Sequence, residues 1–209
     1  MSPRPRATSD EHLLAATHRV VSRLGPNLTL ADVAKEAGVS PATLMQRFGS
    51  KRGLLLAFAA SGAGDISEEF TAIRAQHPSP LAAVHAVARC MAAMADTPQA
   101  LANSLAFLQM DLVDPEFHQH ALVHSRGMQA GIKALLDEAV AARELPRGDT
   151  ARLARAVQAM IGGSLLQWAI DRDGKVADRL TEDLDTLLKS TNSASRPRRR
   201  RLQTRLRRA

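Results

Sequence analysis

Apolar residues recur at intervals of three and four positions along most of the chain, which places them on one face of an α-helix. Alanine and leucine supply most of these apolar positions, and both are strong helix formers. Runs rich in β-branched or aromatic residues, which are typical of strands, are scarce. The pattern therefore predicts an all-α protein.

The first predicted helix has a capping signal at its start and a helix-stopping pair at its end. Thr8 is a candidate N-cap, and Glu11 stands three residues later, as in a capping box. Apolar positions then form one face up to Leu24, and Gly25 with Pro26 ends the helix.

Two shorter helices follow, separated by a glycine turn. The second helix begins after Thr29, with Asp32 three residues later, and stops at Gly38, which suits the left-handed conformation of a helix end. Ser40 caps the third helix, and Pro41 takes its first position, where a missing N–H costs nothing.

Longer amphipathic helices, separated by proline and glycine turns, are predicted over the rest of the chain. Their approximate ranges are 51–75, 80–95, 98–113, 115–143, 150–170 and 176–189. We expect three regions: an N-terminal domain over 1–55, a helical domain over 56–190 and a basic tail over 191–209. The tail offers little apolar surface to bury, which predicts disorder.

Charge is distributed unevenly along the chain, although the formal net charge is +7. Residues 1–55 carry +4, residues 56–192 carry −5, and residues 193–209 carry +8, all of it from arginine. Basic ends on an acidic middle favour a polyanionic partner for the ends. The tail can add sequence-independent phosphate contacts, or it can be a solubilising appendage without a partner.

The segment 29–48, TLADVAKEAGVSPATLMQRF, combines the two short helices with the tight turn at Gly38. This spacing lets one helix brace the DNA backbone while the next enters a major groove. Leu44 and Phe48 lie four residues apart and point inward, so the opposite face of the third helix is free to meet DNA. The alternative is a plain helical hairpin with a solvated face.

Side chains on and beside the outer face of the third helix are the candidate DNA contacts. Gln46 can pair with an adenine edge, and Arg47 can reach guanine or phosphate. Hydroxyl, N–H and ammonium groups near the helix starts can hold phosphates. The complete set of candidates is Thr29, Ser40, Pro41, Ala42, Thr43, Met45, Gln46, Arg47 and Lys51.

This part of the chain, over about residues 8–58, resembles the DNA-binding domain of the TetR family. The matching positions are Thr29, Val33, Ala34, Ala37, Gly38, Val39, Ser40, Leu44, Phe48, Ser50 and Lys51. Two positions depart from the family pattern: Met45 stands where tyrosine is usual, and Arg47 stands where histidine or tyrosine is frequent. The departure bears on the preferred DNA sequence rather than on the mode of binding.

The resemblance implies a DNA-binding transcription regulator, most often a homodimeric repressor that a small-molecule effector releases from a palindromic operator on double-stranded DNA. It also implies that a helical-bundle domain for effector binding and dimerisation follows the helix-turn-helix. In the family, the last two helices usually pair with their copies in a second subunit. A small-residue patch and a leucine stripe fit this pairing: Gly162, Gly163, Ser164, Leu180, Leu184, Leu187 and Leu188. The alternative is that both helices pack only on their own subunit.

The effector site is expected in the helical domain, among apolar, aromatic and methionine side chains. The candidates are His85, Met91, Met94, Asn103, Phe107, Met110, Phe117, Met128 and Trp168. Methionine suits an adaptable pocket, and the mostly apolar set predicts an apolar or amphipathic effector. The alternative for each of these residues is an ordinary core position.

Three histidines, His118, His120 and His124, raise the question of a metal site. His120 and His124 can share one helix face, and Glu116 can extend that row to three ligands. Nothing else in the sequence fixes the geometry that a metal site needs. We therefore expect surface or pocket histidines and no metal.

Other classes of protein find little support. No nucleotide-binding glycine loop, nucleophile elbow or paired catalytic carboxylate occurs, so we assign no catalytic residue and expect neither an enzyme nor a cofactor. No apolar run approaches the ~20 residues that span a bilayer. The N-terminus lacks a secretory apolar region, which favours a cytoplasmic protein. A helical module that binds nucleic acid non-specifically through its basic tail is the main alternative function.

Overall fold

The computed structural model describes residues 8–64 and 66–194, and its regular structure is helical throughout these ranges. The helices are α1 Asp10–Leu24, the short 3-10 helix η1 Gly25–Asn27, α2 Leu30–Ala37, α3 Pro41–Phe48, α4 Lys51–Gly64, α5 Ile66–Ala75, α6 Pro80–Met94, α7 Pro98–Val113, α8 Pro115–Ala141, α9 Thr150–Asp171 and α10 Val176–Ala194. No strand occurs in the two described ranges, and the predicted all-α class is confirmed.

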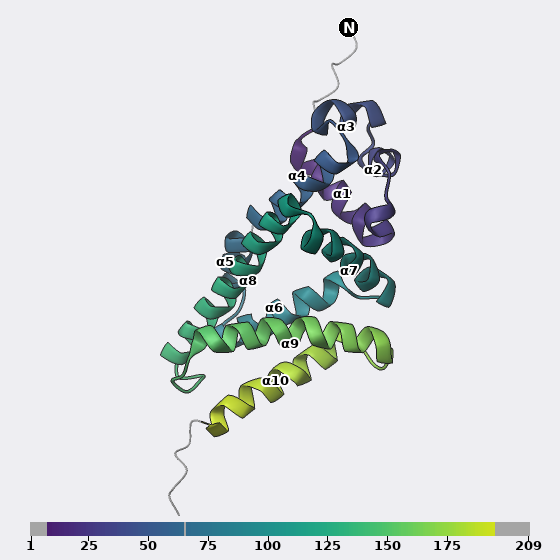
Figure 1. Cartoon of the computed structure of the whole chain (residues 1–209). Coiled ribbons are helices and arrows are strands. Elements are labelled where there is room, and N and C mark those ends of the chain that lie inside the picture. Colours follow the sequence, from purple (N-terminus) through teal and green to yellow (C-terminus); the bar gives the residue numbers. More distant parts are fainter. Residues whose placement is uncertain (1–7, 65, 195–209) are drawn as a thin grey trace, which may run out of the picture.

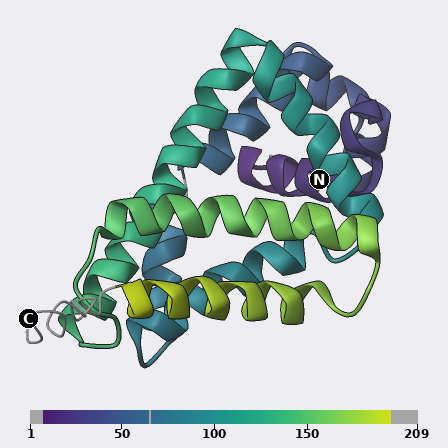
Figure 2. The same ribbon diagram turned by 60° about the horizontal axis from the view of Figure 1, so that its bottom comes forward.

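The helices form a head and a body (Figure 1). The head consists of α1, α2 and α3 at one end of the molecule, and α4 runs from the head into the body. The long helix α8 packs against α4, α5, α6, α7 and α9, so it is the central helix of the body. α9 and α10 lie side by side across the end opposite the head (Figure 2).

The buried apolar side chains form two cores. One core fills the head between α1, α2, α3 and α4, where Leu13, Leu44 and Leu54 are almost completely buried. The other lies in the body between α5, α6, α8, α9 and α10. Phe107 of α7 and Phe117 of α8 belong to the head core, so side chains far beyond residue 55 complete it.

Local signals predict most helix ends correctly, but not the start of the first helix. Ser9 rather than Thr8 caps α1, because the Ser9 hydroxyl accepts a hydrogen bond from the His12 N–H (3.2 Å). The predicted box of Thr8 and Glu11 is therefore wrong. The predicted end is confirmed: Gly25 has φ +60°, and a Cβ there would lie 3.2 Å from the Asn103 amide oxygen.

One of the longer helices extends beyond its predicted range. Over the helix predicted at 51–75, the structure describes α4 to Gly64 and α5 from Ile66, and residue 65 between them lies outside the described residues. α10 continues past its predicted end at Lys189 to Ala194, so residues 191–194 are helical. The rest of the predicted tail, residues 195–209, lies outside the described residues.

The leucine stripe of α10 faces its own subunit. Leu180 and Leu184 are fully buried and Leu188 is nearly so, in the core that α10 shares with α6 and α9. Ser164 of the small-residue patch is also buried. Three of the four stripe leucines, Leu180, Leu184 and Leu188, therefore pack within their own subunit, whereas Leu187 is only partly buried.

Candidate DNA-binding site

Two capped helices and a left-handed turn fix the geometry at the tip of the head. In the predicted capping box of α2, the Asp32 N–H donates to the Thr29 hydroxyl (3.2 Å) and the Thr29 N–H donates to the Asp32 carboxylate (2.8 Å). Hydrogen bonds from the Thr29 hydroxyl and N–H lower the pKa of Asp32. Gly38 has φ +68°, and the Thr43 N–H donates to the Ser40 hydroxyl (3.2 Å) at the start of α3. The predicted turn and both caps are confirmed.

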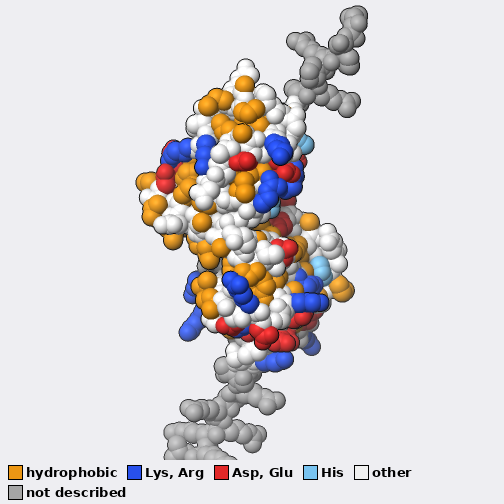
Figure 3. Space-filling view, turned by 90° about the vertical axis from the view of Figure 1, so that its right-hand side faces the viewer, with side chains coloured by type: hydrophobic (Ala, Val, Ile, Leu, Met, Phe, Trp, Pro, Cys, Tyr) orange, Lys and Arg blue, Asp and Glu red, His pale blue; other side chains and the backbone are white. Residues whose placement is uncertain are grey.

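The short helix α3 turns one face into the head core and the other to solvent. Leu44 is fully buried and Phe48 is half-buried, as expected for the inner face. Ala42 and Gln46 are exposed on the opposite face, and Met45 is 51% exposed at its edge. The tip that carries α3 presents apolar and uncharged side chains, with basic side chains on its flanks (Figure 3). This outer face is free to contact a partner.

The hydroxyl groups at the helix starts also remain accessible. Ser40 and Thr43 share a hydrogen bond between their hydroxyls (2.9 Å). Ser40 and Thr29 are exposed, Thr43 is half-buried, and Pro41 is exposed beside them. A phosphate contact needs a free O–H donor, and one hydroxyl of the Ser40–Thr43 pair keeps its proton available, whereas the Thr29 hydroxyl already donates to the Asp32 carboxylate (2.6 Å).

Both basic candidates are already engaged within the head. The Arg47 Nε donates to the Asp10 carboxylate (2.5 Å), and its Nη2 donates to the Thr8 carbonyl oxygen (3.4 Å). The Lys51 Nζ donates to the Pro26 carbonyl oxygen (2.6 Å), and this side chain is half-buried. Lys51 therefore braces the turn before α2 in addition to any contact that it makes outside the protein.

A pair of arginines on α1 ties that helix to α2. Arg19 Nε lies 2.7 Å from one carboxylate oxygen of Glu36, and Arg23 Nη1 lies 3.5 Å from the other. The hydrogen bond from Arg19 is the main cause of the lowered pKa of Glu36. These cations on the flank of the head are thus partly neutralised by an acid of the head itself.

Arg52, in the first turn of α4, joins the head to the turn between α7 and α8. Its Nη2 donates to both carboxylate oxygens of Asp114 (2.8 and 3.0 Å), and its Nη1 lies 2.5 Å from the Glu116 carboxylate. The guanidinium also lies 5.6 Å from the ring centre of Phe117. Hydrogen bonding to Arg52 lowers the pKa of Asp114. Sequence reasoning missed this contact, because only the helix-capping signal of Asp114 is visible in the sequence.

Four of the effector candidates lie where α7 and α8 meet the head. Phe107 and Phe117 pack edge to face with their ring centres 6.0 Å apart, and Met110 packs against the same core. Asn103 is buried, and its Nδ2 donates to the Ser22 carbonyl oxygen of α1 (2.9 Å). These side chains hold α7 and α8 against the head.

Three further effector candidates are buried in the body or bonded to other residues of it. Met128 and Trp168 are buried in the body core, and the Trp168 indole N–H donates to the Gly174 carbonyl oxygen (3.1 Å). His85 of α6 lies 3.4 Å from the carboxylate of Asp185 on α10. Burial lowers the pKa of His85. The histidine therefore contributes to the contact between α6 and α10.

Met91 and Met94, one turn apart on α6, keep some free surface. Met91 is half-buried and Met94 is 52% exposed. Among the nine effector candidates, Met91 and Met94 are therefore the two methionines of α6 that a ligand can reach from solvent.

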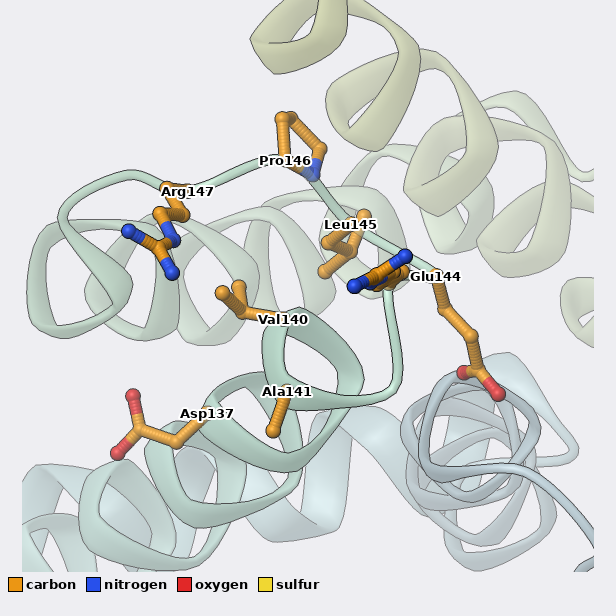
Figure 4. Close-up of a pocket in the computed structure, with 8 residues that line it drawn as sticks. Asp137, Val140, Ala141, Glu144, Leu145, Pro146 and Arg147 are labelled. Atoms are coloured by element: carbon orange, nitrogen blue, oxygen red, sulfur yellow. The ribbon is translucent and has the colours of Figure 1, made fainter.

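A surface cavity of about 780 Å³ lies elsewhere, at the loop between α8 and α9 (Figure 4). Its lining residues are Asp137, Val140, Ala141, Arg143, Glu144, Leu145, Pro146 and Arg147. Glu144 points toward α6, where it accepts a hydrogen bond from the Leu81 N–H (2.9 Å). The nine effector candidates do not contribute to this lining.

The histidines of α8 lie beside α4 and α7. The His124 Nδ1 donates to the Gly62 carbonyl oxygen near the end of α4 (3.0 Å). Burial raises the pKa of Asp111 of α7, and the smaller electrostatic effects of His120 and His124 lower it. Glu116 binds Arg52 and does not extend a row of histidines, which corrects that part of the sequence interpretation. In the described part of the chain, no group of three potential ligands can hold a metal ion.

Membrane insertion of a helix finds no support in the described ranges, where none of the helices has both the length and the apolar character needed to span a bilayer.

Two protein-family models match the chain. The model for bacterial regulatory proteins of the tetR family matches residues 13–58, which hold most of α1, all of α2 and α3, and the start of α4. The model for the C-terminal part of BetI-type transcriptional repressors matches residues 80–193, from α6 into α10.

Similar proteins are transcription regulators. The HTH-type transcriptional regulator BetI of Rhizobium meliloti is 31% identical over 82% of this chain and 84% of its own length. BetI of Agrobacterium fabrum is 29% identical over 76% of this chain and 75% of its own. A TetR regulator of Haloarcula marismortui has the same fold, with a TM-score of 0.68 and 16% identity over 88% of this chain and 96% of its own. FadR of Bacillus subtilis, solved with stearoyl-CoA, has a TM-score of 0.64 and 17% identity over 86% and 98%.

Proposed function

Because the chain belongs to the TetR family of bacterial DNA-binding transcription regulators, we propose that it is a homodimeric repressor that a small-molecule effector releases from its operator. Regulators of this family bind operator DNA as dimers and also bind small-molecule effectors. Family membership, rather than the lack of a catalytic group, separates this protein from enzymes.

The observation that carries the proposal is the exposed outer face of α3, held at the tip of the head by two caps and the left-handed Gly38. In a major groove, the Gln46 amide can pair with adenine and Met45 can contact a thymine methyl group. Phosphates would lie against the helix starts, where N–H groups and one hydroxyl of the Ser40–Thr43 pair can donate, and the Thr29 hydroxyl would donate only after leaving the Asp32 carboxylate. Between the base contacts and the phosphate contacts, the small side chains of Pro41 and Ala42 allow DNA to approach α3 closely.

A second copy of the chain provides the second α3 that a two-fold operator needs. The outer side of α9 supports a contact between copies, because Leu166 is 46% exposed and Ile170 is 66% exposed there. Gly162 and Gly163 are exposed nearby, with open space where a Cβ would lie. Since three of the four stripe leucines of α10 pack within their own subunit, we propose α9 as the main apolar contributor to the dimer.

Release by an effector requires that a change in the body alters the position of the head. α4 connects the two covalently, and Arg52 of α4 binds Asp114 and Glu116 at the α7–α8 turn. Asn103 of α7 also holds the end of α1 through the Ser22 carbonyl. An effector that favours another position of α7 and α8 would change the spacing of the two heads from the ~34–36 Å of adjacent half-sites. Operator affinity would then fall.

The effector in this proposal is apolar or amphipathic. FadR of Bacillus subtilis, which has this fold, was crystallised with stearoyl-CoA, an amphipathic ligand. Among the candidate residues, Met91 and Met94 combine free surface with flexible thioether side chains that adapt to irregular ligands. The buried candidates, such as Phe107 and Trp168, would shape the surroundings rather than contact the ligand directly.

We propose that the two predicted domains have separate functions: residues 1–55 bind DNA, and residues 56–190 bind the effector and the second subunit. The packing of Phe107 and Phe117 into the head core supports a firm connection between these two parts. A regulator of this kind acts on chromosomal DNA, so the proposed location is the cytoplasm.

Selection of bound sequences from random double-stranded DNA tests the proposed function. We expect a palindromic consensus with half-sites one helical turn apart and a footprint of matching length. Equal binding to all sequences would contradict the proposal and would favour a module that binds nucleic acid non-specifically.

A substitution on α6 tests the effector surface. Long-chain fatty acids and their acyl-CoA esters are added to the protein–operator complex, and we expect at least one to release the DNA. Met94→Lys should raise the required concentration about tenfold, because a charge is costly next to an apolar ligand. Val123→Lys, at a position 55% exposed on α8, is the matched control. An equal shift in both variants would exclude Met94 from the site.

A further inference from the structure

The only arginine on α3 is held by an acid from another helix. Arg47 stands in the last turn of α3, and Asp10 is the first residue of α1. Arg47 Nε donates to Asp10 Oδ1 (2.5 Å), and Arg47 Nη2 donates to the carbonyl oxygen of Thr8 (3.4 Å). We propose that Asp10 is a positioning residue that raises the DNA-sequence discrimination of the protein by orienting Arg47. This inference rests on the proposed DNA-binding function.

The end of the Arg47 guanidinium that would contact DNA is left free by these two bonds. Nε and Nη2 donate along one side of the planar guanidinium, and both of these contacts point to the start of α1. Within residues 8–64 and 66–194, Nη1 has no hydrogen-bond partner. Nη1 and the second hydrogen of Nη2 form the end of the guanidinium fork, which matches O6 and N7 of guanine or two phosphate oxygens. Asp10 therefore fixes the fork without blocking it.

Asp10 is also the reason that the guanidinium stays in this place. The N-terminus of a helix carries a partial positive charge and repels a cation. The Asp10 carboxylate, in the first turn of α1, offsets that repulsion and attracts Arg47 directly. Without the carboxylate, the long side chain would sample many rotamers, and fixing one of them on DNA would cost conformational entropy.

The ion pair affects the two kinds of DNA binding differently. Attraction to phosphate depends on net charge, and Asp10 offsets the charge of Arg47, so the pair weakens sequence-independent binding. Hydrogen bonds to a base edge depend on direction, and the pair preserves them. The Arg47 and Asp10 side chains are 44% and 57% exposed, so DNA can reach the pair. Loss of Asp10 should therefore weaken specific DNA binding and strengthen non-specific DNA binding.

The test compares Asp10→Ala with Glu11→Ala. Glu11 is an exposed acid in the same turn of α1, and no hydrogen bond or ion pair joins it to Arg47 among the described residues. Both variants lose one negative charge at the same helix start, and thermal unfolding checks that each remains folded. Affinities are measured for the selected operator, for every single-base-pair variant of one half-site and for random DNA, each at several salt concentrations.

For Asp10→Ala we expect the discrimination at one or two base pairs of the half-site to fall about three- to tenfold relative to wild type. Affinity for random DNA should rise, and its slope against the logarithm of salt concentration should steepen by up to about 1. Glu11→Ala should keep the wild-type base preferences. In an Arg47→Ala background, Asp10→Ala should leave base preferences unchanged, because the residue that it positions is gone.

Two results would overturn the inference: the same base preferences in Asp10→Ala and Glu11→Ala, or an effect of Asp10→Ala that persists without Arg47. The second result would mean that Asp10 contacts DNA itself. A wild-type protein that selects no consensus would instead contradict the proposed function, so the two failures are distinguishable.

Discussion

Neighbouring residues of α3 have very different surroundings. Gln46 is exposed, and no hydrogen bond to its side chain occurs within the described part of the chain, whereas Arg47 is tied to the start of α1. Lys51, a few residues later, donates to the Pro26 carbonyl oxygen. Residue identity alone indicates what each side chain can contact on DNA but not what it contacts within the protein. Their partners within the protein differ: the Gln46 amide has none among the described residues, Arg47 is held at the start of α1, and Lys51 is bonded to the turn before α2.

Replacement of Gln46 by alanine should weaken specific DNA binding far more than non-specific binding. A bidentate pair with adenine contributes about 1–3 kcal/mol of discrimination against the wrong base, and a neutral amide adds no attraction to phosphates. The measurement is the affinity for the selected operator and for random DNA. Gln109→Ala, at an exposed position on α7, is the control. An equal loss on both DNAs would show that Gln46 does not read a base.

Replacement of Asp111 by asparagine should stabilise the protein at neutral pH. Burial raises the pKa of Asp111 when the protein folds, so ionisation opposes folding. Its contribution is favourable at low pH and is lost as the pH rises through the raised folded-state pKa. The melting temperature of Asp111→Asn should therefore exceed that of wild type at pH 7, and the difference should shrink at pH 4.

Asp173→Asn is the matched control for this prediction, because Asp173 is exposed in the turn between α9 and α10. We expect it to change the melting temperature little at either pH. A stabilisation of Asp111→Asn that is the same at pH 4 and pH 7 would mean that the titration of Asp111 is not its cause.

At the scale of elements, short helices depend on their ends. α2 and α3 have eight residues each, and an isolated helix of that length is unstable in water. Capping bonds from Thr29 and Ser40, together with one buried face per helix, compensate for this. The same bonds set the direction in which each helix leaves the turn. The stability of the two helices and the orientation of α3 therefore depend on the same side chains.

Thr29→Ala should therefore destabilise the protein by about 1 kcal/mol, the usual effect of losing an N-cap hydroxyl. The free energy of unfolding in urea measures this loss. Thr186→Ala is the control, because among the described residues the Thr186 hydroxyl bonds only to the Glu182 carbonyl of its own helix, and it lies on the surface of α10. Equal stability losses in the two variants would argue against a special role of the cap.

At the scale of the whole molecule, the proposed DNA-binding tip and the proposed dimer surface lie far apart. α3 is at one end and α9 crosses the other end, with α4, α7 and α8 between them (Figure 1). Arg52 connects the two parts at the α7–α8 turn. The position of each head in a dimer is therefore set by the body, which is what effector control of head spacing requires.

Leu166→Lys should convert the dimer to monomers at micromolar concentration, because it places a charge in the proposed apolar contact on α9. Sedimentation equilibrium measures the change, and operator affinity should fall with it. The control is Leu112→Lys on α7, where the replaced side chain is even more exposed, 68% against 46%. If Leu112→Lys breaks the dimer and Leu166→Lys does not, the proposed surface is misplaced.

The local features of this protein were determined by the sequence itself. Helix periodicity, the Thr29 and Ser40 caps and the left-handed Gly38 depend on residues within one or two turns of each other, so nearby residues suffice to predict them. The inner and outer faces of α3 follow from the same spacing. Even the misplaced first cap differs by one residue only, since adjacent Thr8 and Ser9 are both capable caps.

The tertiary structure alone decided which partner each side chain finds. Arg47 meets Asp10, Arg52 meets Asp114, and Asn103 meets Ser22 across 37, 62 and 81 positions of sequence, and no local pattern encodes such pairs. Similarly, an apolar stripe on a helix shows that one face is buried but not what covers it. The leucines of α10 therefore fitted a dimer contact equally well until the packing against α6 and α9 placed them inside their own subunit.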